Sequence, residues 1–312
     1  MPSRINPDAL RAQLSPLRHA AELTAEARFY QAYYGLDLPH HGGIQRRLGR
    51  FQVHGYEVVA QAWSPEQPVA TLLVLHGYYD HMGLYRHVVD WGLRMGFAVL
   101  ACDLPGHGLS SGPRASINEF EEYQAVLQGL LHEAAAMELP QPWHLLGQST
   151  GAAIVLDYLL CQPVHPALGQ SILLAPLVRP RAWGWSRFSY EVMRRFVKQI
   201  PRRFSENSGD PAFLQFIQSS DPLQPDILPT AWVGALSRWI QRIEGAPASP
   251  HSPLIVQGEA DMTVDWQHNL PVLQDKFAAP EILRLPAARH HLVNEQEALR
   301  REYFGFLSER LK

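Results

Sequence analysis

The stretch Trp143-His-Leu-Leu-Gly147-Gln-Ser149-Thr-Gly151 is an apolar run that ends in a Gly-x-Ser-x-Gly pentapeptide, and a helical pattern follows it over residues 152–160. A tight turn between a strand and a helix requires small residues two positions before and two positions after the serine, which Gly147 and Gly151 supply. Ser149 would then lie at a helix N-terminus, where developing negative charge is favoured. Because such pentapeptides also occur by chance, the motif needs partners elsewhere in the chain.

Short apolar runs with helical patterns between them continue on both sides of this stretch. Continuous rather than alternating apolar runs are typical of strands that are buried on both faces. Alternation with helices predicts an α/β fold with a mostly parallel sheet and helices on both faces. A hairpin that turns near His54-Gly55 precedes them, with strands over 51–53 and 58–63. The expected later strands are 71–75, 98–101, 143–146, 171–174, 254–256 and 282–285, and the expected helices are 86–95, 117–137, 152–160 and 266–277.

The region between residues 174 and 254 has no clear strand. A loop of that length without structure is improbable, so we expect an inserted helical cap after the sixth strand. Apolar spacing predicts cap helices over 188–200, 212–217 and 232–243. The predicted organisation is an N-terminal helical segment over 1–45, an α/β core over 46–178 and 250–312, and a helical cap over 179–249.

Composition excludes several classes of protein. A formal net charge of -3 gives no indication of a nucleic-acid partner. The two cysteines, Cys102 and Cys161, cannot form a disulfide framework and are expected to be buried thiols. Neither a secretory signal nor a run of about 18 apolar residues is visible, which favours a cytoplasmic, soluble protein and leaves peripheral membrane contact open.

An oxyanion site is expected where an earlier strand ends. The sequence Leu75-His76-Gly77-Tyr78 follows the predicted strand 71–75. A backbone N–H at Tyr78 and a second at Thr150 could both point at a substrate oxygen, and such preorganised donors stabilise a tetrahedral intermediate.

The acid and the base should follow Ser149 in the order Asp, then His. Asp261 follows the strand 254–256, and Asp265 is the alternative, expected nearer the start of the next helix. His290 follows the last predicted strand, with His291 as its competitor. The predicted catalytic residues are therefore Ser149, Asp261 and His290, and this chemistry requires no metal or organic cofactor.

Four stretches resemble the monoacylglycerol lipase and lysophospholipase group of α/β-hydrolases. The resemblance implies that Asp261 and His290 are the catalytic acid and base. The chain departs from the group's usual residues in four places: Asp80 and His291 each stand where Glu is usual, Gln148 replaces His, and Thr150 replaces Met. The four stretches are 76–85 (HGYYDHMGLY), 103–114 (DLPGHGLSSGPR), 253–265 (PLIVQGEADMTVD) and 288–295 (ARHHLVNE).

The glycine-rich stretch 103–114 admits two interpretations. Glycine-rich loops after strands can bind phosphate, but this one lacks the lysine and the spacing of a P-loop. We therefore interpret it as a structural loop at the edge of the active site.

The beginning of the predicted cap is basic and aromatic. Residues 179–203 contain eight Lys or Arg and one acid, Glu191, with Trp and Phe between them. Such a helix is typical of an element that contacts a membrane surface. The favoured interpretation is a solvated face whose apolar side packs on the protein, and transient membrane contact is the alternative.

These observations predict a serine carboxylic ester hydrolase that releases a fatty acid from a monoacylglycerol or a lysophospholipid through an acyl-Ser149 intermediate. The alternatives within the fold are a small-ester esterase, a thioesterase and a peptidase-like amidase. A non-catalytic ligand-binding protein is disfavoured because all three catalytic residue types are present in order. The expected partner is a small-molecule or lipid ester, and the sequence leaves the oligomeric state open.

Overall fold

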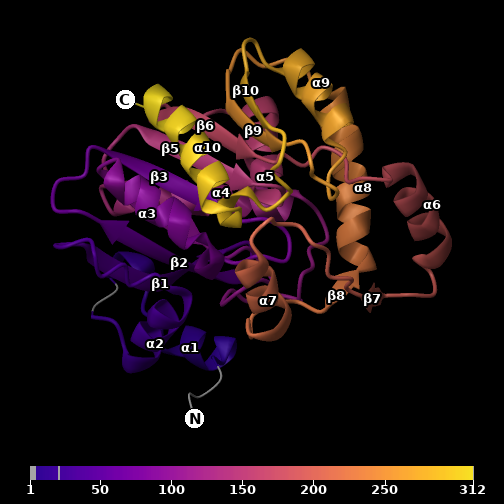
Figure 1. The fold of residues 1–312 in the computed structure, drawn as a ribbon. Coiled ribbons are helices and arrows are strands. Elements are labelled where there is room, and N and C mark those ends of the chain that lie inside the picture. The colour runs from indigo at the N-terminus through magenta and orange to yellow at the C-terminus, as the bar shows by residue number, and fades with distance from the viewer. Residues whose placement is uncertain (1–4, 20–21, 312) are drawn as a thin grey trace.

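The computed structural model describes residues 5–19 and 22–311, and its centre is an eight-stranded sheet (Figure 1). The strand order is β1-β2-β4-β3-β5-β6-β9-β10. Every neighbouring pair from β4 to β10 is parallel, whereas β2 pairs antiparallel with both β1 and β4. The strands are β1 Gln45–Val53, β2 Tyr56–Ser64, β3 Ala70–Leu75, β4 Phe97–Cys102, β5 Trp143–Gln148, β6 Leu168–Leu174, β9 Leu254–Gly258 and β10 Glu281–Leu285.

All eight expected strands are present, and the reason for their continuous apolar runs is visible in β3. Leu73 and Leu75 pack into the hydrophobic core on one face of the sheet, and Leu72 and Val74 pack into the core on the other face. The hairpin turns at His54 and Gly55, both of which have positive φ. The predicted α/β fold with a mostly parallel sheet is therefore confirmed.

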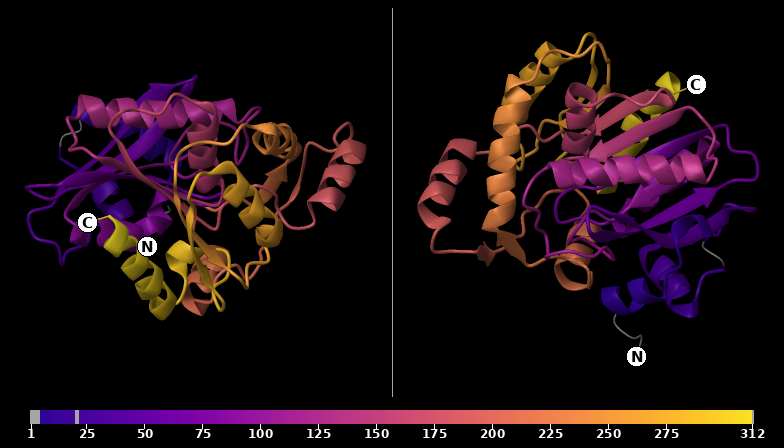
Figure 2. Two further views of the ribbon diagram at one scale, coloured as in Figure 1. Left: turned by 90° about the horizontal axis from the view of Figure 1, so that it is seen from above. Right: turned by 180° about the vertical axis from the view of Figure 1, so that it is seen from behind.

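Helices cover both faces of the sheet (Figure 2). One core contains side chains of α4 (Glu121–Ala136), α5 (Thr150–Cys161), α8 (Thr230–Gly245) and α9 (Trp266–Lys276). The other contains side chains of α1 (Pro7–Gln13), α2 (Ala25–Tyr34), α3 (Arg86–Arg94) and α10 (Glu297–Arg310). The described residues also include three short 3-10 helices. Leu17–His19 packs in the first core, and Met82–Tyr85 and Leu292–Asn294 pack in the second.

Two of these helices differ from the sequence expectation. The helix expected over 117–137 begins only at Glu121, because Glu122 Oε1 accepts the N–H groups of Asn118 and Glu119 and holds them in a turn. Helix α10 was not predicted, although Tyr303 and Leu307 bury its inner face.

The segment 179–249 forms α6 (Trp183–Met193), α7 (Pro211–Ser219) and α8, together with a small antiparallel pair, β7 (Gln199–Pro201) and β8 (Ile227–Pro229). The expectation of one helix over 188–200 is wrong, because the helix begins earlier and ends at Met193, and Ile200 lies in β7. We retain 179–249 as the proposed cap segment and use that name for it below.

The cap segment joins the core beside the loop that follows β9. Arg181 N–H donates to Thr263 O at 2.9 Å, and Asp265 N–H donates to Arg179 O at 2.9 Å. Helix α6 lies beyond α8 at the periphery in every view (Figures 1 and 2). Pro180 also forms an isolated antiparallel bridge with Val264, so the cap segment starts beside the loop that carries Asp261.

The cysteines only partly match the expectation. Cys102 is a buried free thiol in β4, but Cys161, at the end of α5, is half-buried rather than buried. Among the described residues, no helix is both long enough and apolar enough to cross a membrane.

Candidate active site

Ser149 lies at the turn between β5 and α5 in a strained backbone conformation. Its φ is 54° and its ψ is -108°, a region that residues with a side chain rarely adopt and that is usually found at functional sites. The turn has no room for larger neighbours. A Cβ at Gly147 would lie 2.2 Å from the Gly151 carbonyl carbon, and one at Gly151 would lie 2.1 Å from Leu75 O. The two glycines of the pentapeptide are thus sterically required.

The structure brings Asp261 and His290 together from the loops after β9 and β10. His290 Nδ1 donates to Asp261 Oδ2 at 2.7 Å, and both side chains are buried. Asp261 Oδ1 accepts the N–H groups of Thr263 and Val264, which fixes the carboxylate. With Nδ1 engaged in this way, Nε2 is the ring nitrogen left to exchange a proton.

The pair also sets the proton affinity of the imidazole. Burial alone would lower the pKa of His290, but the charge and the hydrogen bond of Asp261 outweigh it and raise the pKa above its ordinary value. Burial raises the pKa of Asp261, and its bonds to His290, Thr263 and Val264 lower it below its ordinary value. Asp261 is therefore a carboxylate that favours the charged imidazolium of His290.

The two competitors predicted for these positions have other partners. His291 Nε2 hydrogen-bonds to Asp80 Oδ1 at 3.0 Å. Asp265 caps α9, where its side chain accepts the His268 N–H at 3.3 Å. Asp80 and His291 each stand where Glu was expected, and in the structure they pair with each other.

Gln148 has a role that the sequence analysis missed. Its Nε2 donates to His290 O at 2.8 Å and so ties the loop of His290 to the turn of Ser149. The signal in the sequence was the departure from histidine at this position, but the partner lies 142 residues away.

The predicted oxyanion donors lie beside Ser149. Among the hydrogen bonds of the described residues, none is donated by the backbone N–H of Tyr78 or of Thr150. Thr150 is the first residue of α5, so its N–H has no partner within the helix. The Tyr78 side chain is fixed by its hydroxyl, which donates to Ala115 O at 2.7 Å, and by stacking on Trp232 at 3.7 Å. Both N–H groups therefore remain free for a ligand oxygen.

The loop 103–114 is held by its own polar groups. Asp103 accepts the N–H of Met82 through Oδ1 and that of Leu109 through Oδ2, each at 2.7 Å. His76 Nε2 accepts the Leu104 N–H at 2.8 Å. The carboxylate and the imidazole hold this loop against the one that carries Tyr78, which agrees with a structural role.

A cavity of about 300 Å³ connects these residues. Ser149, His290, Tyr78 and Thr150 line it, and the cap segment contributes further lining residues. Much of the remaining wall is apolar: Leu177, Pro180, Ile217, Leu228, Trp232 and Val264. The site can therefore hold a ligand with one polar and one apolar end.

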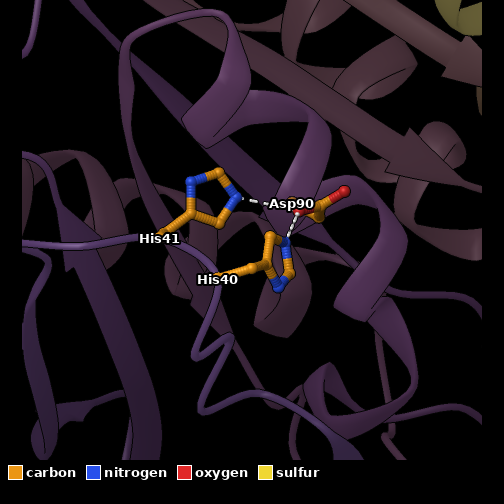
Figure 3. A group of neighbouring side chains, drawn as sticks. All are labelled: His40, His41 and Asp90. Atoms are coloured by element: carbon orange, nitrogen blue, oxygen red, sulfur yellow. Dashed lines mark hydrogen bonds and ion pairs between the residues drawn. The ribbon is translucent and has the colours of Figure 1, made fainter.

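His40, His41 and Asp90 form a separate cluster, in which both rings point at one carboxylate (Figure 3). His40 Nε2 lies 2.6 Å and His41 Nε2 lies 2.8 Å from Asp90 Oδ1. Arg94 binds the other oxygen of Asp90 at 3.0 Å. Imidazole and carboxylate are metal-ligating groups, but here each carboxylate oxygen already has a partner, which accounts for the cluster as a link between the loop after α2 and helix α3.

Comparison with known proteins places this site in a family. The family model described as serine aminopeptidase, S33, matches residues 66–297. The chain belongs to this family.

Several known proteins are similar in sequence or fold to this chain. It is 28% identical over 255 residues to a monoacylglycerol lipase of Mycolicibacterium smegmatis, covering 78% of this chain and 90% of that protein. It is 29% identical over 114 residues to phospholipase YtpA of Bacillus subtilis, covering 36% of this chain and 43% of that protein. In fold it is similar to a soluble variant of monoglyceride lipase from Saccharomyces cerevisiae, with a TM-score of 0.72, 17% identity, and coverage of 85% of this chain and 94% of that one.

The resemblance stated from the four motifs is confirmed. This S33 family chain is a serine ester hydrolase with the α/β-hydrolase fold, and it falls in the monoglyceride lipase group.

Proposed function

We propose that this protein hydrolyses the carboxylic ester of a single-acyl lipid, with Ser149 as nucleophile, His290 as general base and Asp261 as the residue that orients the imidazole. The observation that carries the proposal is the 2.7 Å hydrogen bond between His290 and Asp261 beside the cavity that Ser149 lines. This is the arrangement that a serine nucleophile and its base require.

The proposed reaction has two steps. Ser149 Oγ attacks the ester carbonyl carbon while His290 Nε2 accepts the hydroxyl proton, and the backbone N–H groups of Tyr78 and Thr150 bind the oxyanion. The imidazolium then gives its proton to the leaving alcohol as the ester bond breaks. Water attacks the acyl-Ser149 ester in the same way and releases the fatty acid.

The walls of the cavity favour a lipid ester over the alternatives. Its apolar lining suits an acyl chain, whereas a small ester would leave that surface uncovered. An aminopeptidase needs a carboxylate for the amino group of its substrate. Asp80 is the one acid among the described residues that line the cavity, and it is already hydrogen-bonded to His291. The relatives named as lipases and as a phospholipase agree with this assignment.

Helix α6 supports transient contact with a membrane surface. The favoured interpretation, a solvated face whose apolar side packs on the protein, holds for Trp183, which is buried. It does not hold for Phe188, which is 61% exposed, or for Phe196, which follows the helix and is 86% exposed. Helix α6 packs against α8 and lies at the periphery, and its Trp185 and Phe188 side chains are exposed beside basic residues. Exposed aromatic residues with Lys and Arg are what binding to an anionic bilayer requires.

The test is hydrolysis by the purified protein of 1-oleoylglycerol and of 1-oleoyl-lysophosphatidylcholine, compared with Ser149→Ala. We expect fatty acid release from at least one lipid, and a loss of roughly 10⁶-fold in kcat in the variant. Acetyl and butyryl esters and an aminoacyl amide serve as comparison substrates. A clear preference for any of these over both lipids would contradict the proposal.

A further inference from the structure

Arg202, just after β7, lines the wall of the cavity that Ser149 and His290 also line. Its guanidinium carbon lies 4.0 Å from the ring centroid of Tyr79 and 4.3 Å from that of Phe204. Its Nη1 donates to Gln224 Oε1 at 2.5 Å and to Pro225 O at 3.1 Å. Stacking and two hydrogen bonds therefore fix the plane of the guanidinium, and the hydrogen bonds of the described residues leave its Nε and Nη2 edge unused.

The charge of Arg202 has no counter-ion. Among the described residues, no carboxylate lies within ion-pair distance of it. The acids of its surroundings, Asp80 and Asp221, are each 3.0 Å from a histidine, His291 and His81 respectively. Among the described residues, the Arg202 guanidinium therefore lies in the cavity wall without a carboxylate in direct contact.

Two other arginines show what a structural arginine does in the same region. Arg179 binds Glu244 and Arg242 binds Asp157, each at 2.6 Å. Both hydrogen-bond acceptors of Arg202 are neutral, so neither explains why a cation stands there. A partly buried cation without a counter-ion is costly unless a ligand supplies the negative charge.

We propose that Arg202 binds an anionic phosphate in the head group of the substrate, so that the site prefers a phosphate-bearing monoacyl ester, a lysophospholipid, over a neutral monoacylglycerol. This inference rests on the function proposed above. The Nε and Nη2 groups of a guanidinium can donate to two phosphate oxygens at once, a geometry that a lysine ammonium cannot reproduce. Arg203 lines the same cavity and adds a second, more exposed positive charge.

The test compares two esters that differ only in the phosphate: 1-octanoylglycerol and 1-octanoylglycerol 3-phosphate. Both are used below the concentration at which they form micelles, so that attraction of the basic α6 to an anionic surface does not contribute. We expect Arg202→Gln to lower kcat/KM for the phosphate ester by roughly 10- to 100-fold, the range for one charged hydrogen-bonded contact. For the neutral ester we expect a change of less than about threefold.

Two further variants separate charge from packing. Arg195→Gln removes a charge from the same segment outside the cavity and should leave both kcat/KM values within about twofold. Arg202→Lys keeps the positive charge but loses the two parallel N–H donors of the guanidinium. It should therefore recover only part of the preference for the phosphate ester. The labelling rate of Ser149 by a fluorophosphonate and the melting temperature show whether each variant is folded.

Two results would overturn the inference. An equal loss of kcat/KM on both esters in Arg202→Gln would assign Arg202 a packing role, and unchanged kcat/KM values on both esters would assign it no role in the site. Either result leaves the proposed function intact, provided the neutral ester is hydrolysed. The proposed function itself fails if neither ester shows hydrolysis that depends on Ser149.

Discussion

The loops at the carboxyl ends of the strands and the outer helix α6 follow opposite patterns of burial. In the loops, ionisable side chains are buried and hydrogen-bonded in pairs, as in His290 with Asp261 and His291 with Asp80. In α6, large apolar side chains such as Trp185, 71% exposed, lie in solvent. The comparison shows that the loops fix their ionisable groups in place, whereas α6 leaves large apolar side chains in solvent, which supports the proposed membrane contact.

Part of the cap segment belongs with the loops in this respect. Asp221, after α7, is fully buried and bonds to His81 Nε2 at 3.0 Å and to the Tyr34 hydroxyl at 2.7 Å. This carboxylate joins the cap segment, the loop of Tyr78 and helix α2. The cap segment is thus anchored at its inner side and exposed at its outer side.

The largest effect should come from breaking the pair in the loops. We expect Asp261→Asn to lower kcat by on the order of 10³- to 10⁴-fold, because an amide cannot hold the imidazole in the required tautomer or stabilise its charged form. Steady-state kinetics on a soluble ester measures this. Asp265→Asn is the matched control in the same loop. It weakens only the cap of α9, so a loss comparable to that of Asp261→Asn would contradict the assignment.

Removing the anchor of the cap segment should destabilise the fold. In Asp221→Asn the buried His81 loses its charged partner, and we expect the free energy of unfolding to fall by roughly 3 kcal/mol. Urea denaturation measures the change. The exposed pair of Arg301 and Glu297 provides the comparison, since Glu297→Gln should change stability by less than about 0.5 kcal/mol. If both variants lowered the free energy of unfolding by the same amount, the distinction between anchored and exposed regions would be contradicted.

The pH dependence of catalysis should report the pair directly. The base must be neutral to accept a proton, and Asp261 raises the pKa of His290 above its ordinary value. Therefore kcat/KM should fall about tenfold per pH unit below that raised pKa and level off above it. In Asp261→Asn the carboxylate is absent while burial remains, so the midpoint should move to lower pH. A midpoint that stays unchanged in this variant would show that another group controls the profile.

The smallest effect on stability should come from α6 and the residues that follow it. We expect the double variant Phe188→Ser, Phe196→Ser to change the free energy of unfolding by less than about 0.5 kcal/mol, because both side chains are already exposed. Hydrolysis of a soluble ester should also be unchanged. Co-sedimentation with vesicles containing phosphatidylglycerol should decrease. Unchanged binding to such vesicles would contradict membrane contact through α6.

Local patterns in the sequence were enough to predict the sheet and the positions of the candidate site. Continuous apolar runs report burial on both faces, and the turn of Ser149 requires glycines at fixed positions, so both features are visible within a few residues. The order of Ser149, Asp261 and His290 along the parallel strands then predicted that they would meet at one edge.

What the sequence did not reveal depends on pairs far apart in the chain. The bonds of Asp221 to Tyr34 and His81 join residues separated by 187 and 140 positions. Helix α6 was misjudged because its apolar spacing is the same whether that face packs on the protein or stays exposed. The position of Arg202 in the cavity wall likewise depends on the short β7–β8 pairing, for which three-residue strands give no recognisable pattern.

The most direct test of the account is to trap the covalent intermediate. The protein is treated with a fluorophosphonate that carries a long alkyl chain, and the adduct is located by mass spectrometry of its peptides. We expect a single stoichiometric adduct on Ser149, abolished in Ser149→Ala and much slower to form in Asp261→Asn. An adduct on another residue, or full labelling of the Ser149→Ala variant, would contradict the account.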